Sequence, residues 1–460
     1  MLVDILIHIE LFILNYYAAS FIFSLILIFF SFSKIFQYYY EEKEGNIHSF
    51  YKGKVLPPVT AIIPVYNEEN SILDTIYALL ESEYENLKII IVNDGSKDST
   101  LGILKQSLGL YEGVIIIQQK IKTSAIKTYY HSEKFPNLVV IDKDNGGKAD
   151  SLNVGLNASD TPLVVTIDSD TLLEPKSLTT LVFSILSRPN TLAVGGNLCV
   201  LNGCSYKSGK IIKKSISNAP LTAMQTVDYI RVFLYSRIGL ESFGGPIILS
   251  GAFTLFERKA LIDVRGFECN TVGEDMEVVV KLHEHMHRYN HPCRIGYSPA
   301  ATAWTEVPST FAALWKQRNR WHRALIDSLW RYKHMIFNYK YGMTGLVVIP
   351  YYFFIEFLGS LVEISGYLAF LLHAFIGDLN WYYFGMFILL SLGFSFVLTF
   401  LSVGINLITF NNYESVNVLF KSLFYSFLEQ VTLRQYLVLC RVIATFQYLL
   451  EKLDLKKSKW

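Results

Sequence analysis

The sequence predicts an α/β domain with a mostly parallel sheet, flanked by transmembrane α-helices. Apolar residues make up 51% of the 460 residues and charged residues only 18%, whereas soluble domains are roughly 25% charged. The long uncharged stretches lie towards the two ends of the chain. Between them, short β-branched runs alternate with helical patterns, which is typical of parallel strands covered by helices on both faces.

The first membrane segment is expected at residues 11–33, which carry no charge and are long enough to cross about 30 Å of hydrocarbon as a helix. A cleaved signal peptide is disfavoured because no basic stretch precedes the segment. Residues 1–10 contain acids but no Lys or Arg, whereas Lys34 and Lys43 follow the segment. Because positive residues favour the cytoplasmic side, we expect residues 1–10 to be extracytoplasmic and the next domain to be cytoplasmic.

The central domain is expected over residues 55–310, with its first strands at 59–65 and 88–92. Ligands of such sheets bind at the carboxyl ends of the strands. Asp94 follows the second strand directly, within an Asp-Gly-Ser sequence. On its own this sequence is equally well explained as a turn and helix cap.

A stronger acidic motif follows the strand expected at 162–167, which leads directly into Asp168 and Asp170. In an extended chain, side chains two residues apart point to the same side. Two carboxylates together with a diphosphate form the oxygen-rich site that Mg²⁺ or Mn²⁺ prefers. The sequence therefore predicts a divalent-cation site at Asp168 and Asp170.

Three further polar motifs have both a bland and a functional interpretation. Residues 145–150 (Asn-Gly-Gly-Lys-Ala-Asp) are either a simple loop or a loop that brings Lys148 to a phosphate. Gly273-Glu274-Asp275 precedes a helical pattern at 276–286, where acids often only complement the helix dipole. Near residue 320, helical spacing places an amide, a guanidinium and an indole on one face, which suits a phosphate and a sugar: Gln317, Arg320 and Trp321.

Taken in order, these motifs resemble those of processive family 2 glycosyltransferases, which include cellulose, chitin, hyaluronan and poly-N-acetylglucosamine synthases. The resemblance extends over about residues 55–323 and implies a GT-A nucleotide-diphospho-sugar transferase domain that uses a UDP-sugar, with Mg²⁺ or Mn²⁺ at Asp168 and Asp170. It implies that Asp275 is the general base. The remaining substrate-binding residues implied by the resemblance are Pro64, Tyr66, Glu68, Asp94, Asp150, Asp168, Gln317, Arg320 and Trp321.

The chain departs from many relatives in having Gly273 where they have Thr, and residues 202–217 look like an inserted basic loop. His283-Glu284-His285-Met286-His287 satisfies the zinc-protease pattern His-Glu-x-x-His. We interpret it as a histidine-rich helix face, because it directly follows the proposed base of another active site.

The C-terminal third is expected to adjoin the membrane. Residues 311–343 are basic and aromatic and fit an interfacial amphipathic region; nucleic-acid binding is disfavoured by the net charge of only +1. Residues 344–413 would contain about two spans, in which Glu356 and Glu363 either face a polar interior or mark a helix at the surface. Residues 414–460 look amphipathic, and four lysines near their end favour a cytoplasmic C-terminus: Lys452, Lys456, Lys457 and Lys459. The five cysteines have no paired short spacing and are expected to be free thiols.

The function expected from these features is a multi-pass plasma-membrane enzyme that polymerises a β-linked surface polysaccharide from UDP-N-acetylglucosamine or UDP-glucose. The alternative is transfer of one sugar to a lipid acceptor such as polyprenyl phosphate or diacylglycerol, and a third possibility is a catalytically inactive scaffold. Expected partners are the UDP-sugar, a growing glycan or lipid acceptor and membrane lipids. Because three spans are few for a channel, an accessory membrane subunit or a second copy of the chain is also expected.

Overall fold

The computed structural model describes residues 2–43, 56–115, 117, 119–288, 294–376, 380–406, 413 and 416–453. Lys456, Lys457, Lys459 and Cys293 lie outside the described residues. The four cysteines that the structure describes are free thiols, as expected: Cys199, Cys204, Cys269 and Cys440.

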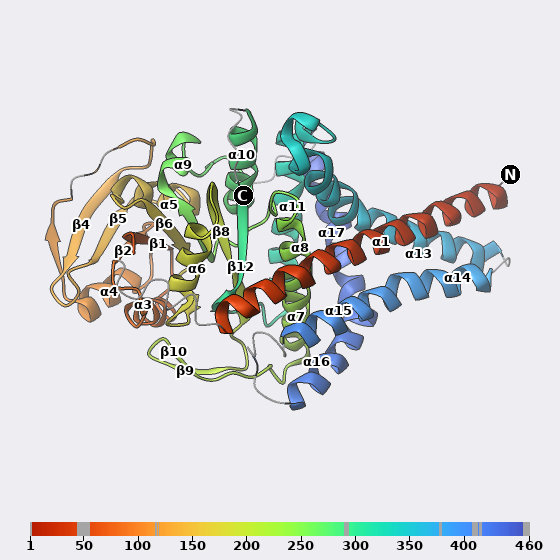
Figure 1. The fold of residues 1–460 in the computed structure, drawn as a ribbon, viewed down its shortest axis with the longest axis horizontal. Coiled ribbons are helices and arrows are strands. Elements are labelled where there is room, and N and C mark those ends of the chain that lie inside the picture. The colour runs from red at the N-terminus through yellow and green to blue at the C-terminus, as the bar shows by residue number, and fades with distance from the viewer. Residues whose placement is uncertain are drawn as a thin grey trace.

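Ten strands of the described residues form one mixed sheet in the α/β domain (Figure 1). In spatial order they are β3 (Leu110–Gly113), β4 (Ile126–Ser132), β5 (Leu138–Lys143), β2 (Leu87–Asn93), β1 (Val59–Val65), β6 (Leu163–Ile167), β11 (Phe253–Glu257), β8 (Thr191–Val200), β12 (Arg294–Thr305) and β7 (Leu172–Leu173).

The sheet is mostly parallel, as the sequence predicts. Neighbours β5, β2, β1 and β6 pair in parallel, and so do β8 and β12. Strand β11 is antiparallel to both β6 and β8, so these two blocks run in the same direction. The other reversed strands are β4 and β7, near or at the edges of the sheet.

Helices cover both faces of the sheet because β1 is apolar on both sides. Ile63 belongs to one buried cluster, with α3 (Ile72–Leu80), α4 (Thr100–Leu108) and α6 (Ser177–Leu186). Its neighbour Ile62 belongs to the opposite cluster, which the following helices complete: α5 (Lys148–Ala158), α9 (Arg258–Asp263) and α10 (Glu274–Arg288). Successive side chains of a strand point to opposite faces. An unbroken apolar run such as β1 therefore needs helices on both faces of the sheet to bury all of its side chains.

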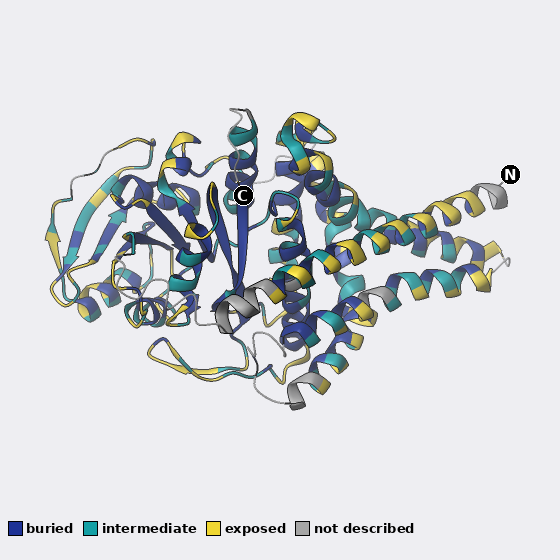
Figure 2. Cartoon of the chain, in the orientation of Figure 1, coloured by how far each residue is buried: buried dark blue, intermediate teal, exposed yellow. Residues whose placement is uncertain are grey.

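Three long apolar segments extend from the α/β domain on one side (Figure 1) and are long and apolar enough to cross a membrane: Leu6–Phe36, Thr344–Ile376 and Trp381–Ile405. The first segment lies in helix α1 (Leu2–Lys43). The second consists of η4 (Thr344–Val348), α12 (Ile349–Tyr351), η5 (Tyr352–Phe357) and α13 (Leu358–Ile376). The third consists of α14 (Trp381–Ile388), η6 (Leu389–Gly393) and α15 (Phe394–Ile405). Figure 2 shows exposed positions along these helices, and many are large and apolar, such as Phe29 and Phe375. Such side chains suit contact with lipid.

The sequence suggests that a membrane helix begins at residue 11. In the structure helix α1 already begins at Leu2 and continues through residues 10 and 11 without a break. Glu10 is buried, with its Oε1 3.1 Å from His373 Nε2 of α13. Glu363 is buried too and faces the interior of the helix bundle, where Arg434 Nη2 donates to its Oε2 over 2.8 Å. Glu10 and Glu363 therefore have partners inside the helix bundle, which favours the polar-interior interpretation of Glu363.

The C-terminal helices α16 (Val416–Leu428) and α17 (Arg434–Lys452), joined by η8 (Glu429–Leu433), pack on the rest of the protein. Helix α16 contacts α7 (Pro220–Arg231), and α17 contacts α11 (Phe311–Arg331) and α13. Two arginines of the expected basic interfacial region, Arg318 and Arg323, are consequently buried in ion pairs. The remaining short elements are β9 (Ser205–Lys207), β10 (Lys210–Lys213), η1 (Val232–Arg237), α8 (Ile238–Glu241), η2 (Lys333–Met335) and η3 (Tyr339–Tyr341).

Candidate functional site

The carboxyl ends of neighbouring parallel strands bring several of the expected residues to one edge of the sheet. Asp94 follows β2, and Asp168 follows β6, with β1 between these strands. Pro64 lies within β1, where its missing N–H costs no ladder bond because β6 pairs with β1 only as far as Ile62. Tyr66 and Glu68 come directly after β1, and the Tyr66 side chain is exposed.

Asp94 and Asp150 are held by a lysine that the sequence analysis did not single out. The Lys143 Nζ forms an ion pair with Asp94 Oδ1 and lies 2.8 Å from Asp150 Oδ2. All three side chains are buried, and Lys143 is completely so. The available signal was a lysine at the end of a strand-like run (138–143), with one residue between it and the 145–150 motif. The arrangement is a buried triad of two carboxylates around one ammonium group.

The Asp94 carboxylate is fully occupied by its own chain. Besides Lys143, the Gly146 N–H donates to Oδ1 over 2.9 Å, and Gly147 N–H and Asn145 Nδ2 donate to Oδ2 over 2.9 and 3.2 Å. A Cβ at Gly146 would lie 2.6 Å from Asp150 Oδ2, so glycine is needed for this close approach. Asp94 in this structure therefore holds the glycine loop that precedes α5.

Helix α5 begins with Lys148, whose side chain points to the acids of the next motifs. Its Nζ lies 2.5 Å from Asp168 Oδ1 and 3.7 Å from Glu274 Oε1. Burial lowers the pKa of Lys148, but the attraction of Asp168, Glu274 and Asp275 outweighs this effect, so the pKa lies above its ordinary value. Lys148 therefore stays protonated and neutralises part of an acidic cluster.

Asp170 is crowded by negative charge. Burial, then the nearby Asp168 and Glu68, raise the pKa of Asp170 to about 6. Thr171 Oγ1 and Thr305 Oγ1 donate to its Oδ1 over 3.3 and 3.4 Å. Among the described residues, no group of three or more His, Cys, Asp or Glu side chains is placed to hold a metal ion. The two carboxylates could thus supply part of a coordination shell, which oxygens from a ligand would have to complete.

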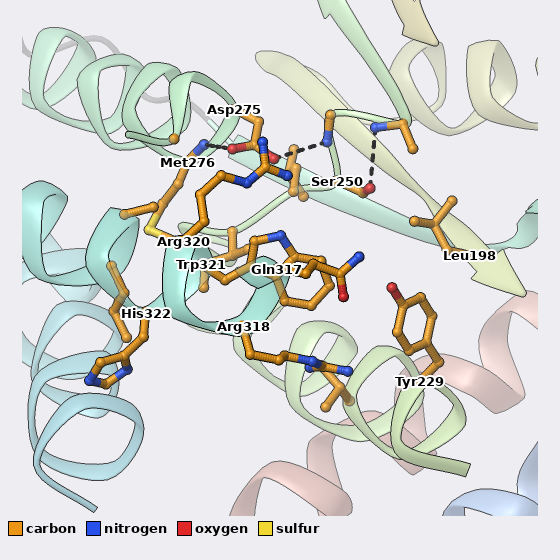
Figure 3. Close-up of a pocket in the computed structure, with 18 of the residues that line it drawn as sticks. Leu198, Tyr229, Ser250, Asp275, Met276, Gln317, Arg318, Arg320, Trp321 and His322 are labelled. Atoms are coloured by element: carbon orange, nitrogen blue, oxygen red, sulfur yellow. Dashed lines mark hydrogen bonds between the residues drawn. The ribbon is translucent and has the colours of Figure 1, made fainter. Parts of the chain in front are cut away.

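Asp275 lies in the first turn of α10 and is fixed by backbone groups. Its Oδ2 accepts from the Gly251 N–H over 3.3 Å and its Oδ1 from the Met276 N–H over 2.9 Å (Figure 3). Gly251 belongs to the turn before β11, where Ser250 Oγ accepts from Ala252 N–H. The carboxylate is therefore oriented by two elements that meet at the pocket.

Helix α11 presents the predicted amide, guanidinium and indole to the same pocket. Thr310 begins the helix, with its side chain accepting from the Ala313 N–H over 3.3 Å. In Figure 3 Arg320 points towards Asp275, whereas Arg318 points towards the helix that carries Tyr229. The pocket has a volume of about 350 Å³, and the predicted residues among those lining it are Asp168, Asp170, Asp275, Gln317, Arg320 and Trp321.

The other five predicted residues do not line this pocket: Pro64, Tyr66, Glu68, Asp94 and Asp150. They occupy the adjoining edge of the sheet, beside β1, β2 and α5. Lys148, which the 145–150 motif offers as a phosphate ligand, also lines the pocket, and the unpredicted residues there include Asp228, Arg318, Glu356 and Arg441. The last four come from α7, α11, η5 and α17, so no local motif could have grouped them.

A second cavity of about 240 Å³ lies between the apolar helices and shares walls with the first. Four residues line both cavities: Asp228, Val232, Glu356 and Arg441. Its lining includes two residues with hydroxyl groups, Tyr16 and Ser20. It also includes the charged members of three ion pairs: Asp228, Arg231, Glu363, Glu429 and Arg434. A polar cavity between the apolar helices thus adjoins the pocket around Asp275.

The His-Glu-x-x-His pattern lies apart from this chemistry. His283 is buried, and its two ring nitrogens lie 3.4 Å from Pro246 O and from Thr344 Oγ1. Burial lowers the pKa of His283 to about 4, so the ring is neutral. Glu284 Oε1 lies 3.0 Å from His334 Nε2. These contacts support the interpretation of a structural helix face.

The covered sheet, the acidic pair at its carboxyl edge and the facing carboxylate of Asp275 define a glycosyltransferase of the GT-A fold. Residues 57–324, more than half of the chain, match the family described as glycosyltransferase like family 2. The chain therefore belongs to that family, as its motifs suggest. The fold is also similar to that of the mannosyltransferase PcManGT from Pyrobaculum calidifontis in complex with GDP-Man and Mn²⁺, at 16% identity and a TM-score of 0.50, over 89% of this chain and 99% of that one.

Two curated relatives are poly-β-1,6-N-acetyl-D-glucosamine synthases. The protein from Staphylococcus epidermidis is 30% identical over 302 residues, which are 64% of this chain and 63% of that protein. The protein from Staphylococcus aureus strain MSSA476 is 30% identical over 267 residues, 58% of this chain and 54% of that protein. The chain thus matches less than two thirds of the length of either relative.

Proposed function

We propose that the protein is a membrane-embedded, inverting glycosyltransferase that polymerises a β-linked surface polysaccharide from a UDP-sugar. The names of the staphylococcal relatives favour UDP-N-acetylglucosamine as the donor, with UDP-glucose as the next candidate. The observation that carries the proposal is the shared pocket. Asp275, Arg320 and Trp321 line one cavity, and that cavity adjoins a polar cavity between the membrane helices.

In this proposal Asp275 is the general base. A sugar hydroxyl must lose its proton as it attacks the anomeric carbon, and a carboxylate within hydrogen-bond reach can accept that proton. Attack from the side opposite the diphosphate inverts the anomeric centre, so an α-linked donor yields a β-linked product. Arg320 points towards Asp275 (Figure 3) and would stabilise negative charge on the departing diphosphate, while the Trp321 indole would stack on the acceptor sugar.

The donor diphosphate would bind near Lys148, Asp168 and Asp170. Burial, then the neighbouring Asp168 and Glu68, raise the pKa of Asp170, and a divalent cation would offset these effects by favouring the charged carboxylate. The similar mannosyltransferase was solved with Mn²⁺, and hard carboxylate oxygens suit Mg²⁺ or Mn²⁺ equally. When bound, the cation would neutralise charge on the diphosphate. Asp94, Lys143 and Asp150 would fix the loop that brings Lys148 to this place.

The acceptor would extend from Trp321 towards the membrane helices. The second cavity offers hydroxyl and charged groups of the kind that hydrogen-bond to sugar hydroxyls. Its position supports a growing glycan as the acceptor. We place the α/β domain in the cytoplasm and the three apolar segments in the plasma membrane, because lysines follow the first segment and a nucleotide-sugar donor is cytoplasmic. Three spans leave room for an accessory subunit or a second copy of the chain beside the cavity.

Membranes containing the protein and radiolabelled UDP-N-acetylglucosamine or UDP-glucose test the proposal. We expect a ladder of products that grows with time, and no product with the Asp275→Asn variant. Label found only in a lipid extract, with one sugar per acceptor, would replace polymerisation by the alternative of single-sugar transfer to a lipid. A matched Asp263→Asn variant, which removes an exposed acid of α9, should behave like the wild type.

A further inference from the structure

Arg318 leaves α11 on a different side from Arg320 and contacts α7 (Figure 3). Its Nη2 lies 3.0 Å from Asp228 Oδ2, and the side chains are 10% and 11% exposed. Burial raises the pKa of Asp228, but Arg318 and then Arg231 outweigh this effect, so the pKa lies below its ordinary value. The charge on Arg318 is thus already neutralised by a protein carboxylate, which makes Arg318 a poor candidate for binding the diphosphate.

The same guanidinium group also contacts Trp321. The Arg318 Cζ lies 4.6 Å from the centre of the Trp321 ring, a distance typical of a cation–π contact. Trp321 is 38% exposed and lines the pocket, so one part of its indole is covered while another remains free for a ligand. Arg318 is therefore placed to fix the orientation of this ring.

Asp228 is in turn held by a second arginine. Arg231 Nη2 donates to Asp228 Oδ1 over 2.8 Å, and both terminal nitrogens of Arg231 bind Glu429, over 2.8 and 2.9 Å. Arg231 Nη1 also donates to Thr399 Oγ1 of α15 over 3.1 Å. Within these contacts two acids face two arginines, and Arg441 adds a further positive charge that lowers the pKa of Asp228.

We propose that Arg318 is a positioning residue for Trp321, anchored through Asp228 and Arg231 to Glu429 of the C-terminal segment. The inference rests on the proposed function, in which Trp321 stacks on the acceptor sugar. It adds that the acceptor subsite depends on helices far away in the sequence. Arg318 acts on the acceptor through the indole, whereas the proposed contacts of the donor diphosphate are Lys148, Asp168, Asp170 and Arg320.

A double-mutant cycle between Arg318 and Trp321 tests this role. Membranes carrying Arg318→Met, Trp321→Phe or both are assayed with UDP-N-acetylglucosamine and a short β-1,6-linked N-acetylglucosamine oligosaccharide. We expect Arg318→Met to raise the acceptor KM about tenfold, the effect of a lost cation–π contact in a desolvated site, and to change the donor KM less than about twofold. In the Trp321→Phe background, Arg318→Met should have almost no further effect.

Two further variants guard against misfolding. Arg318→Lys retains the ion pair with Asp228 but cannot lie flat on an indole, so it should still raise the acceptor KM about threefold. Arg331→Met is the control on the same helix, because Arg331 pairs with an acid too, here Asp327 over 2.7 Å. It should leave both KM values unchanged.

The outcomes separate the two proposals. Three results would each overturn the positioning role while leaving the enzyme's function intact. The first is an equal effect of Arg318→Met in the wild-type and Trp321→Phe backgrounds, and the second is a wild-type acceptor KM in Arg318→Lys. The third is a donor KM that Arg318→Met raises as much as the acceptor KM. Absence of any sugar transfer by wild-type membranes from either donor would overturn the proposed function, and this inference with it.

Discussion

The Lys143 ammonium group lies 2.8 Å from the Asp150 carboxylate, with both side chains buried. Asp94 shares the same ammonium group and receives the N–H groups of Gly146 and Gly147. One lysine therefore joins the carboxyl ends of β2 and β5 to the start of α5. Its ammonium group offsets the negative charge that the two buried carboxylates bring together.

Replacing Lys143 by methionine should strongly destabilise the α/β domain. The change leaves two buried carboxylates without a cation, which costs about 3–5 kcal/mol by analogy with other broken buried ion pairs. Thermal unfolding of the detergent-purified protein measures the loss. Lys127→Met is the control, since Lys127 pairs with Asp144 at 3.2 Å on the exposed edge of the sheet and should cost less than about 1 kcal/mol. Equal melting temperatures of the two variants would contradict a structural role for the triad.

Asp275→Asn should abolish sugar transfer while leaving donor binding unchanged. The amide can accept the hydrogen bond from Gly251 but cannot take up a proton from the acceptor, so we expect a loss of at least about 10²-fold in kcat. Transfer is measured with radiolabelled donor, and binding with the same donor at equilibrium. Full biological function of this variant would instead support the inactive-scaffold interpretation.

Asp170→Ala should abolish turnover, and chelation of divalent cations should do the same to the wild type. The variant lacks one of the two carboxylates, Asp168 and Asp170, that are proposed to bind the cation, and the cation would then no longer be held beside the diphosphate. Activity is measured after EDTA treatment and after adding back Mg²⁺ or Mn²⁺. Undiminished turnover with EDTA, or in Asp170→Ala, would remove the cation from the proposed function.

Glu363→Gln should destabilise the membrane helices, because it leaves the Arg434 guanidinium without its bidentate carboxylate partner. We expect a cost of about 3 kcal/mol or more for the single variant. The double variant Glu363→Gln with Arg434→Gln should recover much of that stability, since no uncompensated charge remains. Unfolding in detergent compares the three proteins, and additive losses would show that the two side chains do not depend on each other.

The sequence predicted those parts of the fold that local patterns determine. Strand β1 and the acids after β6 were expected because β-branched runs and short spacings are visible within a few residues. The reversed direction of β11 was not expected, since its pairing with β6 joins residues about 90 positions apart, such as Phe253 and Ile167. Pairing direction depends on the path of the chain and leaves no local mark.

The same limit applies to the site. Gln317, Arg320 and Trp321 share a helix face, so their convergence followed from helical spacing. The burial of Arg318 did not, because its partner Asp228 lies 90 residues earlier in the chain. Likewise, the charge on Glu10 suggested the end of a membrane span, but the structure pairs it with His373. The sequence places Glu10 and Arg318 near the membrane surface, because partners so distant leave no local pattern.

The packing of α1 has a consequence for how the protein is made. This helix contacts α8, η1 and α13, and it approaches Gly239 so closely that a Cβ there would lie 2.6 Å from the Leu27 carbonyl oxygen. Helix α1 is synthesised before Gly239 and His373, which emerge some 210 to 360 residues after the residues they contact. Glu10 therefore cannot contact His373, and Leu27 cannot contact Gly239, until the whole α/β domain has been synthesised, so this part of the helix bundle closes only after that domain is complete.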